Sequence, residues 1–303
     1  MYNKLSIAVA FLVAATHAAD YTCSNEVISE SYDNVYVSTG SCTLSGANVT
    51  GSIQGSGGFD ININGGTYVG GNININGNNK LTISGSQSNL VKGGITSNGI
   101  VRVEDGATVE GNIGVTDSFS FFRVWQSTVN YINVQNGALV AIKGSTVKNG
   151  IRVVGSGKVR INRIVGVGNI IENGNVQVHD NESVKIVSTE VVNGALDVTS
   201  NESLLMEDVY VKFNAQVSNN ANPGNINIID TTVDGTLTVQ NNNDVSITGS
   251  DGNILTCQSN TNVLGSDNDF TATGSAGSDQ CDPIYTWVHN RWKMGLLAES
   301  DER

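Results

Sequence analysis

Cationic side chains recur at one position of a repeating pattern, and their type and spacing suit the binding of a polyanion. Each cation at this position stands between two apolar residues. The alternation typical of strands therefore places its side chain on the outer surface. The cations at or beside this position are Arg102, Arg123, Lys143, Lys158, Arg160 and Lys185. A row of such groups suits an acidic polysaccharide, whose carboxylates repeat along its chain. The alternative is that they are solubilising charges paired with acids such as Glu104.

The charge of the chain is unevenly distributed. Residues 102–185 hold nine Lys or Arg and seven acids, a net of +2, whereas residues 186–303 hold four bases and sixteen acids, a net of −12. The whole chain is also at −12. Such an acidic protein is a poor partner for nucleic acid, so we predict none.

Other catalytic or metal-binding patterns are sparse. The histidines that follow the N-terminal segment, His179 and His289, are far apart, and no Ser-His-Asp set can be argued. The Asp267-Asn268-Asp269 and Glu207-Asp208 clusters carry oxygen ligands of the kind that calcium takes, but neither has the spacing of a dedicated loop. Weak calcium binding by these clusters is the alternative, but we expect solvated turns and predict no metal site and no cofactor.

The unit that must position the cations is clearest between Tyr131 and Asn149, YINVQNGALVAIKGSTVKN. Apolar residues two apart, interrupted by Asn-Gly and Gly-Ser, indicate three short strands and two turns. Between the first two strands, units carry Asn or Asp, which tolerate positive φ. We expect positive φ at Asn78, Asn98, Asp117, Asn136, Asn181, Asn201 and Asn242.

This unit repeats along the chain. The inward residue of the second strand recurs at intervals of 18 to 25 residues, namely at Leu44, Ile63, Ile83, Val103, Val124, Ile142, Ile161, Ile186, Met206, Ile228 and Ile247. A sustained period near 20 residues predicts a solenoid. The expected fold is all-β: a single-stranded parallel β-helix of about eleven coils of about 20 residues, with three parallel sheets and capped ends.

In this pattern, residues from about Asn34 to Leu255 resemble the right-handed, pectin-lyase-like parallel β-helices. The intervals are not the strict multiples of six that a left-handed hexapeptide helix requires. The resemblance implies a possible polysaccharide lyase or epimerase, with Arg123 or Arg160 as the base and carboxylates holding calcium. No aligned cluster of three acids accompanies these arginines, and only Arg160-Ile161-Asn162 approaches a hydrolase motif of that fold. Whether the protein is an enzyme is therefore left open, and we lean towards a non-catalytic role.

The chain ends predict secretion and two caps. Residues 1–18 combine Lys4, an apolar run and a small-residue cleavage site, which is typical of a secretory signal peptide. We expect an N-terminal cap at 19–33, the β-helix at 34–255, and a C-terminal cap and tail at 256–303 containing Trp287 and Trp292. Disulfides are predicted between Cys23 and Cys42 and between Cys257 and Cys281, one at each end. No membrane-spanning segment is predicted.

Three sequons, at Asn48, Asn181 and Asn201, are candidate glycosylation sites if the source is a eukaryote. Together these features predict a secreted, non-catalytic β-solenoid that binds a cell wall, matrix or surface. The alternatives are a lyase or epimerase acting on uronates, and a secreted effector recognised by another organism.

Overall fold

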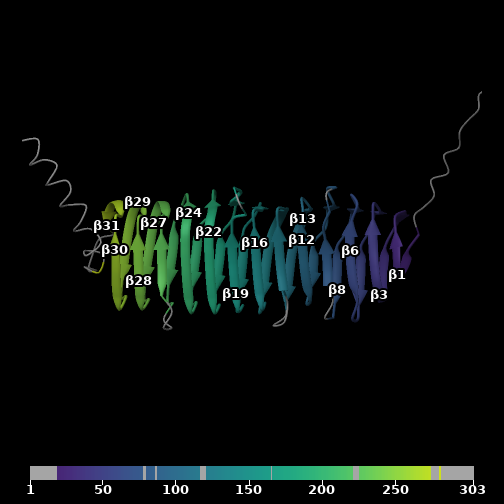
Figure 1. Ribbon diagram of the computed structural model, residues 1–303, viewed down its shortest axis with the longest axis horizontal. Coiled ribbons are helices and arrows are strands. Elements are labelled where there is room, and N and C mark those ends of the chain that lie inside the picture. The colour runs from purple at the N-terminus through teal and green to yellow at the C-terminus, as the bar shows by residue number, and fades with distance from the viewer. Residues whose placement is uncertain are drawn as a thin grey trace, which may run out of the picture.

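The computed structural model describes residues 19–77, 80–85, 87–116, 121–164, 166–220, 225–273 and 280. The predicted signal peptide, Cys281 and the tail with Trp287 and Trp292 lie outside the described residues. The described chain is a parallel β-solenoid of about 12 turns. Figure 1 shows its strands stacked side by side along a rod, with β1 at one end and β31 at the other.

The strands belong to three parallel arrays, here called sheets A, B and C in the order in which each coil visits them. Sheet A contains β5 (Ile53–Ser56), β8 (Ile73–Asn76), β11 (Ile95–Ser97), β18 (Ile151–Val154), β21 (Val176–His179), β23 (Leu196–Thr199) and β25 (Ala215–Ser218). Sheet B contains β6 (Asp60–Asn64), β9 (Lys80–Ile83), β12 (Ile100–Glu104), β14 (Phe121–Trp125), β16 (Leu139–Lys143), β19 (Lys158–Asn162), β26 (Ile226–Ile229), β28 (Asp244–Thr248) and β30 (Asn262–Ser266). Sheet C contains β2 (Ser31–Tyr32), β4 (Asn48–Val49), β7 (Tyr68–Val69), β10 (Leu90–Val91), β17 (Thr146–Val147) and β20 (Asn169–Ile171).

The remaining strands bend around a corner and contribute to two sheets, so that the three sheets join into one hydrogen-bonded array. Sheets A and B share β1 (Tyr21–Ile28) and β3 (Val35–Ser45). Sheets B and C share β22 (Ser183–Val191) and β24 (Ser203–Val211). Sheets C and A share β13 (Thr108–Thr116), β15 (Thr128–Gln135), β27 (Thr232–Gln240), β29 (Asp251–Gln258) and β31 (Asp269–Thr273).

The predicted aliphatic column is confirmed. Every inward residue of the second strand, from Leu44 to Ile247, is at most 2 % exposed. Neighbouring members face each other in register, as Val124 does with Ile142 and Ile142 with Ile161. Stacking like aliphatic side chains along the axis gives one continuous core, which is how a solenoid gains stability from contacts between adjacent coils.

The positive-φ residues differ from the prediction at most of the described positions. Asn136 has φ +55°, as expected, but Asn98, Asn181, Asn201 and Asn242 do not have positive φ. Before Asn181, Asn201 and Asn242, the preceding residue takes that conformation instead, namely Asp180, Ser200 and Asn241. Asn78 and Asp117 lie outside the described residues. At Asn181, Asn201 and Asn242 the prediction was wrong by one residue, because the asparagine after the bend turns inward and has a different role.

That role is a buried hydrogen-bonded row at the corner between sheets A and B, here called the asparagine ladder. Its members are Asn181, Asn201, Asn220, Asn242 and Asn260, all at most 5 % exposed. Each side-chain Oδ1 accepts the backbone N–H of the inward corner residue one coil earlier, over 2.7–3.0 Å. At the C-terminal end the Oε1 of Gln280 accepts the N–H of Asn260 over 2.7 Å. The ladder thus satisfies backbone donors that the bend removes from the sheets.

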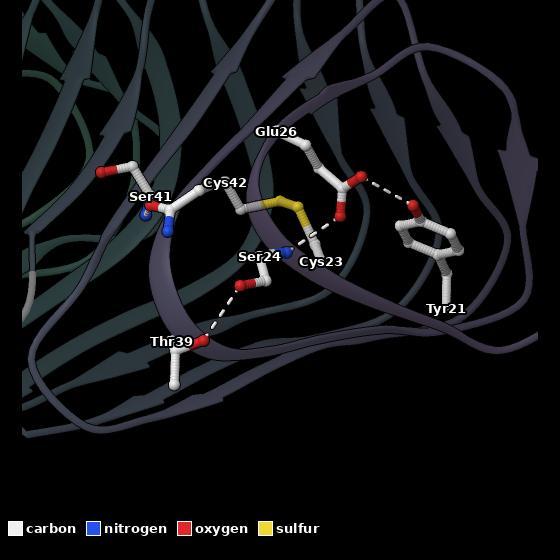
Figure 2. The surroundings of a disulfide bond; sticks show 8 residues. Tyr21, Cys23, Ser24, Glu26, Thr39, Ser41 and Cys42 are labelled. Carbon is white, nitrogen blue, oxygen red and sulfur yellow. Dashed lines mark hydrogen bonds between the residues drawn. A yellow bond between two sulfur atoms is a disulfide. The ribbon is translucent and has the colours of Figure 1, made fainter.

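The predicted disulfide between Cys23 and Cys42 is confirmed, with the two Cα atoms 5.8 Å apart. Both cysteines are fully buried and link β1 to β3 at the N-terminal end. Figure 2 shows the polar contacts around it: Tyr21 and the Ser24 N–H both donate to the Glu26 carboxylate, each over 2.9 Å. The disulfide therefore joins the first coil covalently to the second. Cys257, which was predicted to pair with Cys281, is buried in β29.

Candidate functional site on sheet B

The structure aligns the predicted cations on the outer face of sheet B. Arg102 pairs in register with Arg123, Arg123 with Ala141, Ala141 with Arg160, and Arg160 with Lys185. Adjacent strands are about 4.8 Å apart, so the column carries four cations in five coils over about 19 Å. Ala141, the gap in the column, is only 6 % exposed.

The two flanking lysines lie on either side of this gap. Lys143 follows Ala141 by two residues on β16. In the strand register it lies opposite Trp125 on one side and Asn162 on the other. Lys158 precedes Arg160 by two residues on β19. In the strand register it lies opposite Leu139 on one side and Ser183 on the other. Lys158 and Arg160 are exposed, whereas Lys143 and Lys185 are half-buried. Within the described residues none of these four makes an ion pair.

Aromatic rings hold the two N-terminal arginines of the column. The Arg123 guanidinium lies 3.7 Å from the centroid of a Trp125 ring, and the Arg102 guanidinium lies 5.3 Å from the Phe121 ring centroid. These are cation–π distances, and they fix the guanidinium planes on the sheet. We call Arg102, Phe121, Arg123 and Trp125 the arginine–aromatic cluster.

Glu104 is the one acid next to this cluster in the described column. Its Oε1 lies 3.2 Å from Arg123 Nε, close enough for an ion pair, yet the two atoms do not have hydrogen-bond geometry. Among the described residues, Arg102 Nε and Trp125 Nε1 are also buried and find no hydrogen-bond partner. Buried donors without a partner are uncommon in folded proteins. The alternative that these cations are solubilising charges predicts pairing with Glu104, and the ion pair between Glu104 and Arg123 agrees with it.

The structure also brings together a pair that the sequence left apart. His179 and Asp197 lie on neighbouring strands β21 and β23 of sheet A, with His179 Nε2 3.4 Å from Asp197 Oδ2. Thr199 donates to the other carboxylate oxygen, Oδ1, over 2.5 Å. The carboxylate stands between the imidazole and the hydroxyl, so the histidine is not placed to activate Thr199 as a nucleophile. In register, His179 lies opposite Thr199 and Asp197 lies opposite Gln177, so the pair is a diagonal contact between adjacent strands.

A cleft of about 670 Å³ lies at the corner between sheets B and C, away from the cationic column. One wall comes from Arg163, Gly166, Val167 and Gly168 in the longest coil, where Ile164 and Val167 form an antiparallel bridge. Across it lie carboxylates from three successive coils, Glu190, Asp208 and Asp230. No polyanion would bind among these acids, so the cleft and the cationic face are separate features.

The predicted calcium candidates occupy corners of the solenoid. Asp267 has φ +57°, and the Oδ1 of Asn268 accepts the Ser250 N–H over 3.0 Å. Asp208 accepts a hydrogen bond from Ser188 Oγ over 2.6 Å. Among the described residues no group of three or more His, Cys, Asp or Glu side chains is arranged to hold a metal ion.

The three sequons differ in accessibility. Asn48 is exposed on β4 of sheet C, whereas Asn181 is 1 % exposed and Asn201 is 2 % exposed. Both buried amides belong to the asparagine ladder, in which Asn181 Nδ2 donates to Asn201 Oδ1 over 2.8 Å. A glycan on either nitrogen would have to break this row. Among the three, only Asn48 presents its side chain to solvent in the folded chain.

No family model, curated protein or solved structure matches this chain. In the described part, no helix is long and apolar enough to cross a membrane. The site must therefore be interpreted from its own geometry.

Proposed function

We propose that this protein acts outside the cell as a non-catalytic β-solenoid that binds acidic polysaccharide of a cell wall or matrix through the outer face of sheet B. The observation that carries the proposal is the in-register column of Arg102, Arg123, Arg160 and Lys185. Secretion rests on the N-terminal segment of the sequence. The finer fold assignment, a right-handed coil like that of the pectin-lyase-like proteins, is part of the same proposal.

Electrostatics favours a ligand with repeating negative charge. Two unit charges about 4.8 Å apart in water repel by about 0.9 kcal/mol. The adjacent pairs in the column, Arg102 with Arg123 and Arg160 with Lys185, carry this repulsion in the unbound protein, and Glu104 relieves it only at Arg123. A chain of carboxylates laid along the column would relieve it at every coil, and binding would weaken as salt rises.

The arginine–aromatic cluster favours binding over proton abstraction. A guanidinium is not deprotonated in proteins, and Arg123 lies against the Trp125 ring and beside Glu104. The cluster is thus suited to hold planar carboxylates rather than to remove a proton.

The proposal is tested by removing two charges of the column and comparing a variant with the same charge change elsewhere. Arg160→Ala with Lys185→Ala should weaken binding to polygalacturonate by about tenfold or more, because each loses a charge-assisted contact. The control is Lys92→Ala with Lys212→Ala, whose positions follow sheet C strands. Affinity electrophoresis at two salt concentrations gives the comparison. Equal loss in both double variants, or no binding by the wild type to polygalacturonate or alginate, would refute the proposal.

A further inference from the structure

Among the described residues, the outer face of sheet A near the N-terminal end carries no charged side chain along its centre. Its in-register central column, through consecutive coils from β1 to β15, consists of Thr22, Tyr36, Gln54, Asn74, Thr96, Gly114 and Asn133. The first charged member of this column is Arg152 on β18. An uncharged strip of seven coils is unexpected in a chain with a net charge of −12.

Part of this strip is hollowed into a groove of about 250 Å³ over β3, β5 and β8. The groove lies towards the β1 end of the rod in Figure 1, where β3 and β8 are labelled. The outward side chains that line it are Tyr36, Ser38, Gln54, Ser56, Asn74 and Asn76. All are hydroxyls or carboxamides, and all except half-buried Tyr36 are exposed.

Three of these groups keep their hydrogen-bonding capacity unused. Within the described structure, Tyr36 Oη and the amides of Gln54 and Asn74 make no side-chain hydrogen bond. This contrasts with the corners, where amides such as that of Asn201 are fully engaged in the ladder. The groove therefore presents donors and acceptors that only solvent or a ligand can satisfy.

These properties restrict the chemistry of the ligand. A charged ligand would find no counter-charge in the groove, and desolvating it there would be unfavourable. A peptide strand could not be added, because the groove lies on a sheet face whose backbone groups are already paired. A carboxamide donates through its NH₂ and accepts through its oxygen, so it can bridge neighbouring hydroxyls of one sugar. The Tyr36 ring adds an apolar surface of the kind that aromatic residues offer at binding sites.

We propose that this groove binds a neutral polysaccharide chain, running along the rod with Gln54 and Asn74 contacting successive parts of the chain at intervals of about 4.8 Å. The site is on a different sheet from the cationic column and takes a ligand of different charge. It therefore does not depend on the function proposed for sheet B. The two sites together would allow the protein to bridge neutral and acidic glycans of one matrix.

Calorimetric titration of the full secreted chain with cellohexaose, laminarihexaose and chitohexaose tests this site. At least one hexasaccharide should bind, with an affinity that is unchanged by added salt because no charges meet. Gln54→Ala and Asn74→Ala should each weaken it by about tenfold, the loss of one or two hydrogen bonds. Both residues are exposed, so circular dichroism should show an intact fold.

The matched control is Gln177→Ala, which removes the same amide from the same outward column beyond Arg152. It should leave the affinity unchanged, as should the double change at Arg160 and Lys185. Failure of all three neutral probes to bind, or an equal loss with Gln177→Ala, would overturn the proposal without bearing on the sheet B site. Binding that falls steeply with salt would also overturn it.

Discussion

Replacing Asn201 by alanine should destabilise the solenoid far more than replacing an exposed asparagine of a similar cross-coil pair. Asn201 Oδ1 accepts both the backbone N–H and the Nδ2–H of Asn181, over 3.0 and 2.8 Å. Its own Nδ2 donates to the carbonyls of Val178 and Thr199, over 3.0 and 3.1 Å. Asn201→Ala therefore leaves two buried donors of Asn181 without an acceptor and two carbonyls with one donor fewer.

The magnitude follows from the two orphaned donors. Each buried group left unsatisfied costs about 1–3 kcal/mol, so the expected loss is about 4 kcal/mol within a range of about 2–6 kcal/mol. The matched control is Asn193→Ala, because Asn193 Nδ2 donates to Asn173 Oδ1 over 3.2 Å at an exposed corner. Water can replace that contact, so its loss should change stability by no more than about 0.5 kcal/mol.

Native-state hydrogen exchange is the suitable assay, because a solenoid can open coil by coil rather than all at once. In Asn201→Ala, a loss of about 4 kcal/mol should lower protection of the β21 and β23 amides by about three orders of magnitude, while β5 and β8 stay unaffected. Chemical denaturation gives an independent measure of the same change. If Asn201→Ala and Asn193→Ala differ by less than about 0.5 kcal/mol, the ladder does not stabilise the corner as described.

Three further predictions concern accessibility, packing and ionisation. Expressed through a eukaryotic secretory pathway, the folded protein should carry a glycan at Asn48 and none at the buried Asn181 and Asn201; peptide mass spectrometry would contradict this by finding either buried site occupied. Gly71→Ala would place its Cβ 2.7 Å from the Gly51 carbonyl, so thermal unfolding should show a loss of about 1–3 kcal/mol, whereas Gly58→Ala meets no atom within 4 Å and should be nearly neutral. The Tyr210 O–H donates to Asp234 over 2.6 Å, and this bond raises the Tyr210 pKa above 10.0. The raised pKa means that the contribution of this bond to stability is complete below the unfolded pKa of about 10 and is lost as pH rises through the folded value. Asp234→Asn should lower the Tyr210 pKa in an ultraviolet titration, and an unchanged pKa would show that the carboxylate is not its cause.

The repeat could be predicted because its signal is chemical and local. A strand with one buried face needs apolar residues two apart, and the chain supplies them once per coil on each of three sheets, as Ile132, Val140 and Val147 illustrate in one unit. The same alternation predicted that Arg102, Arg123, Arg160 and Lys185 point outward, and the structure aligns them on the outer face of sheet B. Cys23 and Cys42 could be paired because both lie near the same end of one column.

The tertiary structure decided which residues meet across coils. At the corners, Asp, Asn and Ser suit both the left-handed bend and the inward position after it, so composition could not distinguish Ser200 from Asn201. Likewise, Glu104 meets Arg123, and His179 meets Asp197, only because coils of 18 to 22 residues place them side by side. The sequence by itself determined the period and the inward and outward faces, because the alternation of apolar and polar residues is contained in each strand. Hydrogen bonds and ion pairs act over a few ångströms between coils, so the buried ladder, the arginine–aromatic cluster and the uncharged groove emerge only when the coils stack.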